Sequence, residues 1–198
     1  RLMNIVIVGG GPTGVELSGA LAEMKHYVLP KDYPELDFSK MNIYLLEGGS
    51  KTLGSMSERS SEDSYKYLTR LGVKVMTSTI VSNFDGNDVY LKNGSSIPAK
   101  TVIWAAGVTG ALPPGLDKTL IVKGNRLIVD RYSKIKGSTN IYAIGDIAYM
   151  ETPKYPKGHP QLAATAIQQA TVLAKNLKRL LRKETRFTEF EYFDKGTM

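Results

Sequence analysis

Short apolar runs alternate with longer amphipathic segments through the first half of the chain. The β-branched run at 3–8 predicts a buried strand, and the apolar positions of 12–29 recur at helical spacing. A strand at 41–47, an amphipathic helix at 57–72 and a third strand at 73–78 continue the pattern. This order predicts an α/β fold in which a Rossmann-like parallel sheet is wound with helices.

Prolines and turn dipeptides mark where these elements are expected to end. Pro30 should end the first helix, and the proline-containing segment 30–40 should be a loop. Further along, Asp85-Gly86 and Asn93-Gly94 are strong turn signals between alternating segments. They predict a small antiparallel β-meander over 81–100.

A break then separates two expected domains. Residues 101–107 return as a buried strand, and Pro113-Pro114-Gly115 interrupts the chain after it. We therefore expect a domain boundary between 107 and 118. The elements expected beyond it are short strands near 120–122 and 126–130, a strand at 140–148, a loop at 154–160 and a long helix at 161–183.

The long helix has an apolar stripe, which is consistent with core packing and also with a ligand-facing surface. Gln169 lies on the shoulder of the stripe and Gln168 on the opposite side. Small residues over 163–166 leave room for a bulky group, and the free N–H groups at the helix start suit the negative charge of a reduced flavin. The stripe comprises Leu162, Ala166, Ala170, Leu173, Leu177 and Leu180.

Composition narrows the class of protein. Apolar residues make up 42% and charged residues 23% of the 198 positions, as in soluble globular proteins. No apolar run approaches the ~18 residues that a membrane span needs, and no signal peptide is visible. Cysteine is absent, and His26 and His159 lie far apart, so we expect no disulfide or metal site within these residues.

The net charge of +7 is concentrated near the end of the chain, where 175–186 holds six basic residues and one Glu. This segment fits a solvated helix face, or attraction to an anionic membrane or acidic partner. Nucleic-acid binding is not expected, because no recognised module accompanies the charge. The chain opens on Arg1 and a core strand and has no cap at its end, so we expect a fragment of a longer protein.

The strongest motif joins the first strand to the first helix. Gly9 permits a tight turn, Gly11 lets the backbone approach a pyrophosphate closely, and Gly14 lets the helix pack against the strand. The first free N–H groups of the helix then face the phosphates. The motif predicts dinucleotide binding, and a ligand-free glycine turn is the alternative.

An acidic residue ends the second strand, where a dinucleotide ribose is expected. Glu47 there would accept hydrogen bonds from the two adenosine ribose hydroxyls and repel a 2′-phosphate, which favours NAD over NADP. It lies 33 residues after Gly14, against about 20 in the usual fingerprint. The loop at 30–40 accounts for the excess, and an ordinary exposed strand-end Glu is the alternative.

Two further carboxylates have both a structural and a functional interpretation. Glu16, assigned to the first turn of the glycine-motif helix, fits favourable interaction with the helix dipole or a place near the reacting end of the cofactor. Asp146 follows Gly145 at the end of an expected strand. It fits hydroxyl binding at the carboxyl end of a sheet, or a plain turn.

Together these segments resemble the two-dinucleotide-binding flavoproteins, and most closely the type II NADH dehydrogenases, which are single-subunit NADH:quinone oxidoreductases. Members of that family have an FAD domain interrupted by an NADH domain. The resemblance implies that 1–107 is the NAD(H)-binding domain and 108–198 the incomplete returning portion of the FAD-binding domain. The matching segments are 9–24, 45–49, 101–108, 140–146, 159–177 and 193–198.

The resemblance also implies roles for individual residues. On the NADH side it implies that Glu47 binds the ribose and that Val81 contacts adenine. Glu16 would serve hydride or proton delivery near nicotinamide and quinone. The residues implied to bind the pyrophosphate are Gly9, Gly11, Pro12, Thr13 and Gly14. On the flavin side it implies that Gly145 and Asp146 bind the ribityl chain and that the backbone of Gln161 and Leu162 contacts the flavin. Lys195 would lie beside the flavin, and Ala106 and Gly107 would lie where the two cofactors meet. Gln168 and Gln169 fall in the quinone-tunnel helix, although Ala164 stands where the family often has Gln.

The implied activity of the intact protein is hydride transfer from NADH to FAD, then reduction of a membrane quinone in a respiratory chain. The family binds peripherally to the cytoplasmic face of the inner membrane through a C-terminal segment absent here, so the fragment is expected to be soluble. It should bind NADH weakly, hold FAD poorly and show no turnover. A homodimer is left open. Another FAD-dependent reductase acting on disulfides or ferredoxin, and a non-catalytic NADH-binding module, are the alternatives.

Overall fold

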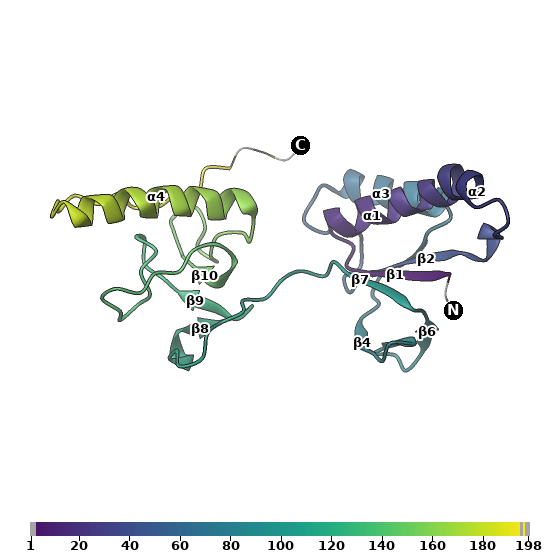
Figure 1. Ribbon diagram of the computed structural model, residues 1–198, viewed down its shortest axis with the longest axis horizontal. Helices are drawn as coiled ribbons and strands as arrows, with labels where there is room; N and C mark the ends of the chain where they lie inside the picture. Colours follow the sequence, from purple (N-terminus) through teal and green to yellow (C-terminus); the bar gives the residue numbers. More distant parts are fainter. Residues whose placement is uncertain (1–2, 195, 197–198) are drawn as a thin grey trace. The chain divides into compact units, whose positions relative to one another are not determined.

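Four parallel strands form a sheet in the first part of the chain, with the order β3-β2-β1-β7 in the computed structural model. This is the strand order of one half of a Rossmann fold, and it confirms the predicted α/β class. The strands are β1 (Asn4–Val8), β2 (Asn42–Leu46), β3 (Lys74–Met76) and β7 (Thr101–Trp104). Figure 1 labels three of them, β1, β2 and β7.

Both faces of this sheet are covered, which explains why its strands read as continuous apolar runs. On β1, Ile7 faces a cluster that includes side chains of the helices α1 (Pro12–Glu23) and α3 (Glu58–Arg70). Val6 and Val8 face the opposite cluster, formed with the antiparallel meander. The predicted meander is confirmed, with strands β4 (Val81–Phe84), β5 (Asp88–Leu91) and β6 (Ser96–Pro98).

The first helix continues past its predicted end. α1 stops at Glu23, a π-helical turn spans Met24–Val28, and a short helix α2 covers Leu29–Asp32. The prediction that Pro30 ends the helix was wrong, because Pro30 lies in the first turn of α2, where no backbone N–H is needed.

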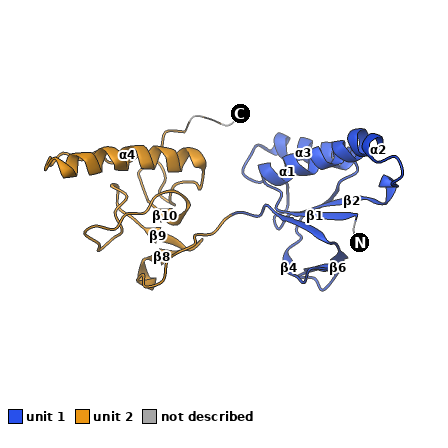
Figure 2. Ribbon diagram, in the orientation of Figure 1, with its two compact units in different colours: residues 1–107 blue, residues 108–198 orange. Residues whose placement is uncertain are grey.

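The chain divides into two compact units, residues 1–107 and 108–198, called unit 1 and unit 2 (Figure 2). The structure describes residues 3–194 and 196. In unit 2 a three-stranded sheet has the order β10-β9-β8, and one long helix lies in the C-terminal half of the unit. These elements are β8 (Ile121–Val122), β9 (Arg126–Ile128), β10 (Ala148–Tyr149) and α4 (Ala163–Leu181).

The strand predicted at 140–148 does not form as a continuous element. Tyr142 makes an isolated bridge to Lys134, a single helical turn covers Gly145–Ile147, and β10 follows it. A strand in the middle of a sheet needs neighbours on both edges. Within the described residues, 140–144 is paired only along the edge that faces 133–135.

The side of α4 that is buried in unit 2 is polar, contrary to the predicted stripe. Its buried residues are Thr165, Gln169 and Asn176, whereas Leu180 of the stripe is 50% exposed. Leu173 and Leu177 are only partly buried and line an apolar groove of about 290 Å³. The buried amides are kept in the fold because they bond backbone groups of other segments.

Candidate functional site

The turn after β1 needs glycine at its first position. Gly9 has a φ of +111°, and a side chain there would place its Cβ 2.5 Å from the carbonyl oxygen of Ala105. The Gly9 N–H donates to the carbonyl of Leu46 at 2.7 Å, which ties the turn to the neighbouring strand. Gly9 is therefore required by the protein itself, with or without a ligand.

The other two glycines of the motif have different requirements. A Cβ on Gly14 would lie 1.8 Å from the carbonyl oxygen of Gly9, so α1 can approach the turn only because Gly14 has no side chain. A Cβ on Gly11 would meet no protein atom within 4 Å. Space next to Gly11 is therefore open to a ligand.

The first turn of α1 offers unpaired backbone donors beside this space. Gly11 is the N-cap and Pro12 the first helical residue, which has no N–H to leave unpaired. The N–H of Val15 already bonds the carbonyl of Gly11 at 3.0 Å. The N–H groups of Thr13 and Gly14 are those that an α-helix leaves without an internal acceptor, which suits an anionic phosphate.

Glu47 lies half-buried just after β2, and its carboxylate is held in place by the backbone. One oxygen accepts from the N–H of Gly10 at 2.6 Å, and the other from the N–H of Gly49 at 2.5 Å. Each carboxylate oxygen has further acceptor capacity. The carboxylate is thus fixed at the edge of the glycine turn and can still accept two ligand hydroxyls.

These groups border one hollow of about 460 Å³ at the carboxyl ends of the parallel strands. The predicted residues Gly9, Gly11, Glu47 and Ala106 line it, and Gly107, with a φ of +97°, is the next residue after Ala106. Sequence reasoning missed the other seven lining residues, although the strand-end rule could have found them. They are Val8, Leu46, Gly48, Thr79, Ile80, Trp104 and Ala105.

Val81, the residue expected to contact adenine, lies next to a lining residue of the hollow. Ile80 lines the hollow, whereas Val81 begins β4 and packs against the buried cluster under the meander. Adjacent residues of an extended chain point to opposite sides, which accounts for this difference between Ile80 and Val81. The contact of Val81 with adenine stays a prediction.

Glu16 also lies elsewhere than expected. α1 begins at Pro12, so Glu16 is the fifth helical residue and not part of the first turn. The helix-dipole effect falls off within that turn, which weakens the structural explanation for an acidic residue here. Its side chain is exposed and is not among those that line the hollow.

In unit 2, the predicted flavin-side residues gather around the turn at Gly145–Ile147. The side-chain amide of Gln161 donates to the carbonyl of Asp146 at 3.0 Å, and Leu162 is the N-cap of α4. The Asp146 side chain is exposed. The structure thus brings together four of the predicted residues, Gly145, Asp146, Gln161 and Leu162, between β10 and the start of α4.

The two glutamines expected near quinone bond different parts of unit 2. Gln168 exchanges two hydrogen bonds with the backbone of Phe193, at 2.9 and 3.0 Å. Gln169 is buried and accepts from the N–H of Gly145 at 2.7 Å. The predicted residue Lys195 lies outside the described residues.

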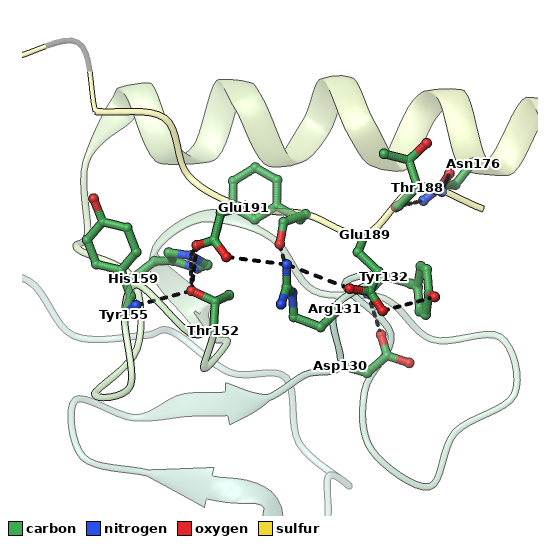
Figure 3. Close-up of polar contacts among 11 residues, drawn as sticks. Asp130, Arg131, Tyr132, Thr152, Tyr155, His159, Asn176, Thr188, Glu189 and Glu191 are labelled. Atoms are coloured by element: carbon green, nitrogen blue, oxygen red, sulfur yellow. Dashed lines mark hydrogen bonds and ion pairs between the residues drawn. The ribbon is translucent and has the colours of Figure 1, made fainter.

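A buried histidine cluster in unit 2 was missed by sequence reasoning. His159 is 1% exposed, and its ring lies against Tyr155 and Phe190, with ring centroids 5.0 and 5.1 Å away. Its Nε2 lies 3.4 Å from the Thr152 hydroxyl and 3.8 Å from a Glu191 carboxylate oxygen (Figure 3). Burial lowers the pKa of His159, and the nearby Glu191 opposes that shift in part.

The cluster fastens a C-terminal segment to the body of unit 2. Arg131 lies between Glu189 and Glu191 and pairs with both, at 3.8 and 3.4 Å (Figure 3). Its Nε donates to the carbonyl of Phe190, and the Phe190 N–H donates to the carbonyl of Arg131, each at 2.8 Å. Asn176 of α4 makes a similar two-way contact with Thr188.

Lowering the pH from 7 to 5.5 is expected to reduce the free energy of unfolding through His159. Its pKa in the folded chain lies below the ordinary value of 6.5, so the unfolded chain binds the proton more readily. Stability from this group is fully present above pH 6.5 and is lost as the pH falls through the folded pKa. Urea unfolding at several pH values measures the effect.

His159→Gln should flatten that pH dependence, because the substituted side chain does not titrate. His26→Gln is the matched control, since it removes the chain's other histidine from an exposed position. An equal flattening in both variants would contradict the assignment to His159.

Within the described residues, no group of three or more His, Cys, Asp or Glu side chains is arranged to hold a metal ion. Among the helices of the same described part, none has the length and apolar character that crossing a membrane requires.

The sequence model of the family described as pyridine nucleotide-disulphide oxidoreductase matches residues 2–170. The chain is 29% identical to the type II NADH:quinone oxidoreductase Ndh of Mycobacterium tuberculosis, over 100% of this chain and 44% of that protein. It is 32% identical to the type II NADH:quinone oxidoreductase of Haemophilus influenzae, over 99% of this chain and 44% of that protein. The chain therefore spans less than half the length of these curated relatives.

Among solved structures, NDH2 from Plasmodium falciparum has a similar fold. Its complex with RYL-552 matches 99% of this chain and 55% of that one, with a TM-score of 0.83 and 20% identity. Its complex with NADH matches 89% of this chain and 51% of that one, with a TM-score of 0.77 and 20% identity. At 20% identity, this likeness shows that the two chains share a fold.

Proposed function

The chain belongs to the pyridine nucleotide-disulphide oxidoreductase family, and we propose that it is part of an NADH:quinone oxidoreductase that contains FAD. In this proposal, residues 1–107 bind NADH and 108–198 contribute the returning part of an FAD-binding domain. The flavin supplies the two-electron chemistry that takes hydride from NADH and passes electrons to a membrane quinone. The residues of this chain bind and orient the two cofactors.

The observation that carries the proposal is the hollow in unit 1. The open side of Gly11 and the unpaired N–H groups of Thr13 and Gly14 suit a pyrophosphate, and Glu47 suits an unphosphorylated ribose. Trp104 and Ile80 offer apolar surface at the edge of the same hollow. These donors and acceptors match NADH better than NADPH, because a 2′-phosphate would meet the Glu47 carboxylate.

Unit 2 fits part of an FAD site. Asp146 presents an exposed carboxylate at the end of a glycine turn, where it could accept hydrogen bonds from ribityl hydroxyls. The N-terminus of α4 lies after Leu162, and its first N–H groups suit the electron-rich edge of a flavin. Lys195 is proposed beside the flavin from the resemblance alone.

The acceptor side of the proposal rests on the relatives named above. Glu16 is proposed near nicotinamide and quinone, and Gln168 near the quinone. Peripheral attachment to the cytoplasmic face of the inner membrane, through a segment outside this chain, belongs to the same proposal, as does a homodimer.

The test uses the full-length protein. We expect purified protein to show the visible absorption bands of FAD, and we expect anaerobic NADH to bleach them. Addition of a soluble quinone analogue should restore the bands, whereas ferredoxin or a disulfide substrate should not.

Each alternative outcome contradicts a different part of the proposal. Full-length protein that binds NADH without flavin would be a non-catalytic binding module. Reoxidation by ferredoxin or disulfide, with none by quinone, would assign the protein to another branch of flavin-dependent reductases.

A further inference from the structure

The turn that presents Asp146 is held by α4 and the residues before it. The Gln161 amide bonds the carbonyl of Asp146, and Gly145 approaches α4 so closely that a Cβ there would lie 3.3 Å from the Cβ of Ala166. Gly145 has a φ of +69°, so the turn adopts a backbone conformation that most residues avoid. Such a turn needs support from its surroundings.

Gln169 supplies that support from inside the fold. Its side chain is 1% exposed, and its Oε1 accepts the N–H of Gly145 at 2.7 Å. Gln169 and Ala166 are three residues apart on α4, so they contact the turn from one face of the helix. Without this acceptor, the Gly145 N–H would be left unpaired at a partly buried position, which is costly.

We infer that Gln169 is the positioning residue that fixes the Gly145–Asp146 turn, and through it the Asp146 carboxylate, for flavin binding. This inference rests on the proposed function, in which Asp146 binds the ribityl chain. It also separates the two neighbouring glutamines. Gln169 acts inside unit 2, whereas Gln168, which bonds the backbone of Phe193 nearer the surface, keeps its proposed place near the quinone.

The chemistry of the contact dictates the variants of the test. In the full-length protein, Gln169→Met keeps the length and volume of the side chain and removes the acceptor. Gln169→Glu keeps an acceptor at the same reach, and Gln169→Asn withdraws it by one methylene. The matched control is Lys175→Met, which makes the same kind of change at an exposed position of α4.

We expect the dissociation constant for FAD to rise roughly tenfold in Gln169→Met and by less in Gln169→Asn. Gln169→Glu should stay near the wild-type value, and Lys175→Met should not differ from it. The measurement is FAD release, followed by flavin fluorescence, with the circular dichroism melting curve of each variant as the check on folding. If Gln169→Met does not fold, the test is the comparison of the dissociation constants for FAD of Gln169→Asn and Gln169→Glu.

A role in packing alone predicts the opposite order, because Met fills the site and Glu places a charge in it. FAD binding by Gln169→Met equal to that of the wild type would overturn the inference. The same result with a raised KM for quinone would assign Gln169 to the quinone site instead. A wild-type protein without FAD would overturn the proposed function, which separates that failure from the failure of Gln169 as a positioning residue.

Discussion

Gly14→Ala is expected to destabilise unit 1 by about 3 kcal/mol or more and to weaken NADH binding by roughly 100-fold. The added methyl group would lie 1.8 Å from the carbonyl oxygen of Gly9, and that oxygen belongs to a turn already fixed against Leu46. Neither partner can move away without opening the contact between α1 and β1. Urea unfolding of the chain and titration with NADH measure the two effects.

Gly11→Ala is the matched control, because its methyl group meets no protein atom. Gly11 also has φ −73° and ψ −177°, which any residue adopts. The free energy of unfolding of the Gly11→Ala variant should change by at most about 1 kcal/mol, the usual cost of Ala at an N-cap. NADH binding should nevertheless weaken, since the space beside Gly11 is where the pyrophosphate is proposed. Unchanged NADH affinity in Gly11→Ala would contradict that placement.

Glu47→Gln is expected to weaken NADH binding by roughly 10-fold to 100-fold and to reduce the preference for NADH over NADPH. A carboxamide has one acceptor oxygen, so it cannot serve the N–H groups of both Gly10 and Gly49. It also removes the negative charge that opposes a 2′-phosphate. Trp104, the single tryptophan of the chain, lines the same hollow, so its fluorescence reports the titration.

Glu23→Gln removes an exposed carboxylate from the end of α1 and should leave both affinities unchanged. It controls for the general effect of net charge on binding an anionic nucleotide. Equal losses of NADH affinity in Glu23→Gln and Glu47→Gln would show that Glu47 has no local role.

Sequence reasoning was most successful where one local pattern determines the structure. The parallel strands of unit 1 carry apolar residues on both faces, and the turns at Asp85-Gly86 and Asn93-Gly94 define the meander. The structural requirements predicted for the three motif glycines agree with the backbone. A side chain at Gly9 or Gly14 would collide with other backbone atoms, whereas the space beside Gly11 is free of protein atoms.

The errors arose where tertiary neighbours decide the structure. The segment 140–148 has the composition of a central strand, but in the described part of unit 2 a helical turn interrupts it at Gly145–Ile147 and 140–144 is paired along one edge only. Pro30 was tolerated because a new helical turn begins beside it.

The buried contacts of unit 2 could not be predicted from spacing. His159 and Glu191 are 32 positions apart, and Gln169 and Gly145 are 24 apart, so nothing local links them. The periodicity of α4 indicated an apolar buried face, whereas the buried face carries Gln169 and Asn176. Amides placed there are stable because backbone donors and acceptors of other segments meet them.

The most direct test of the account is a titration of the chain with NADH and with FAD, followed by Trp104 fluorescence. We expect a saturable change with NADH that is weakened in Gly11→Ala and Glu47→Gln, and no competition from FAD. Saturable binding of FAD that is lost in the same two variants, with no response to NADH, would contradict the assignment of the unit 1 hollow to the nicotinamide cofactor.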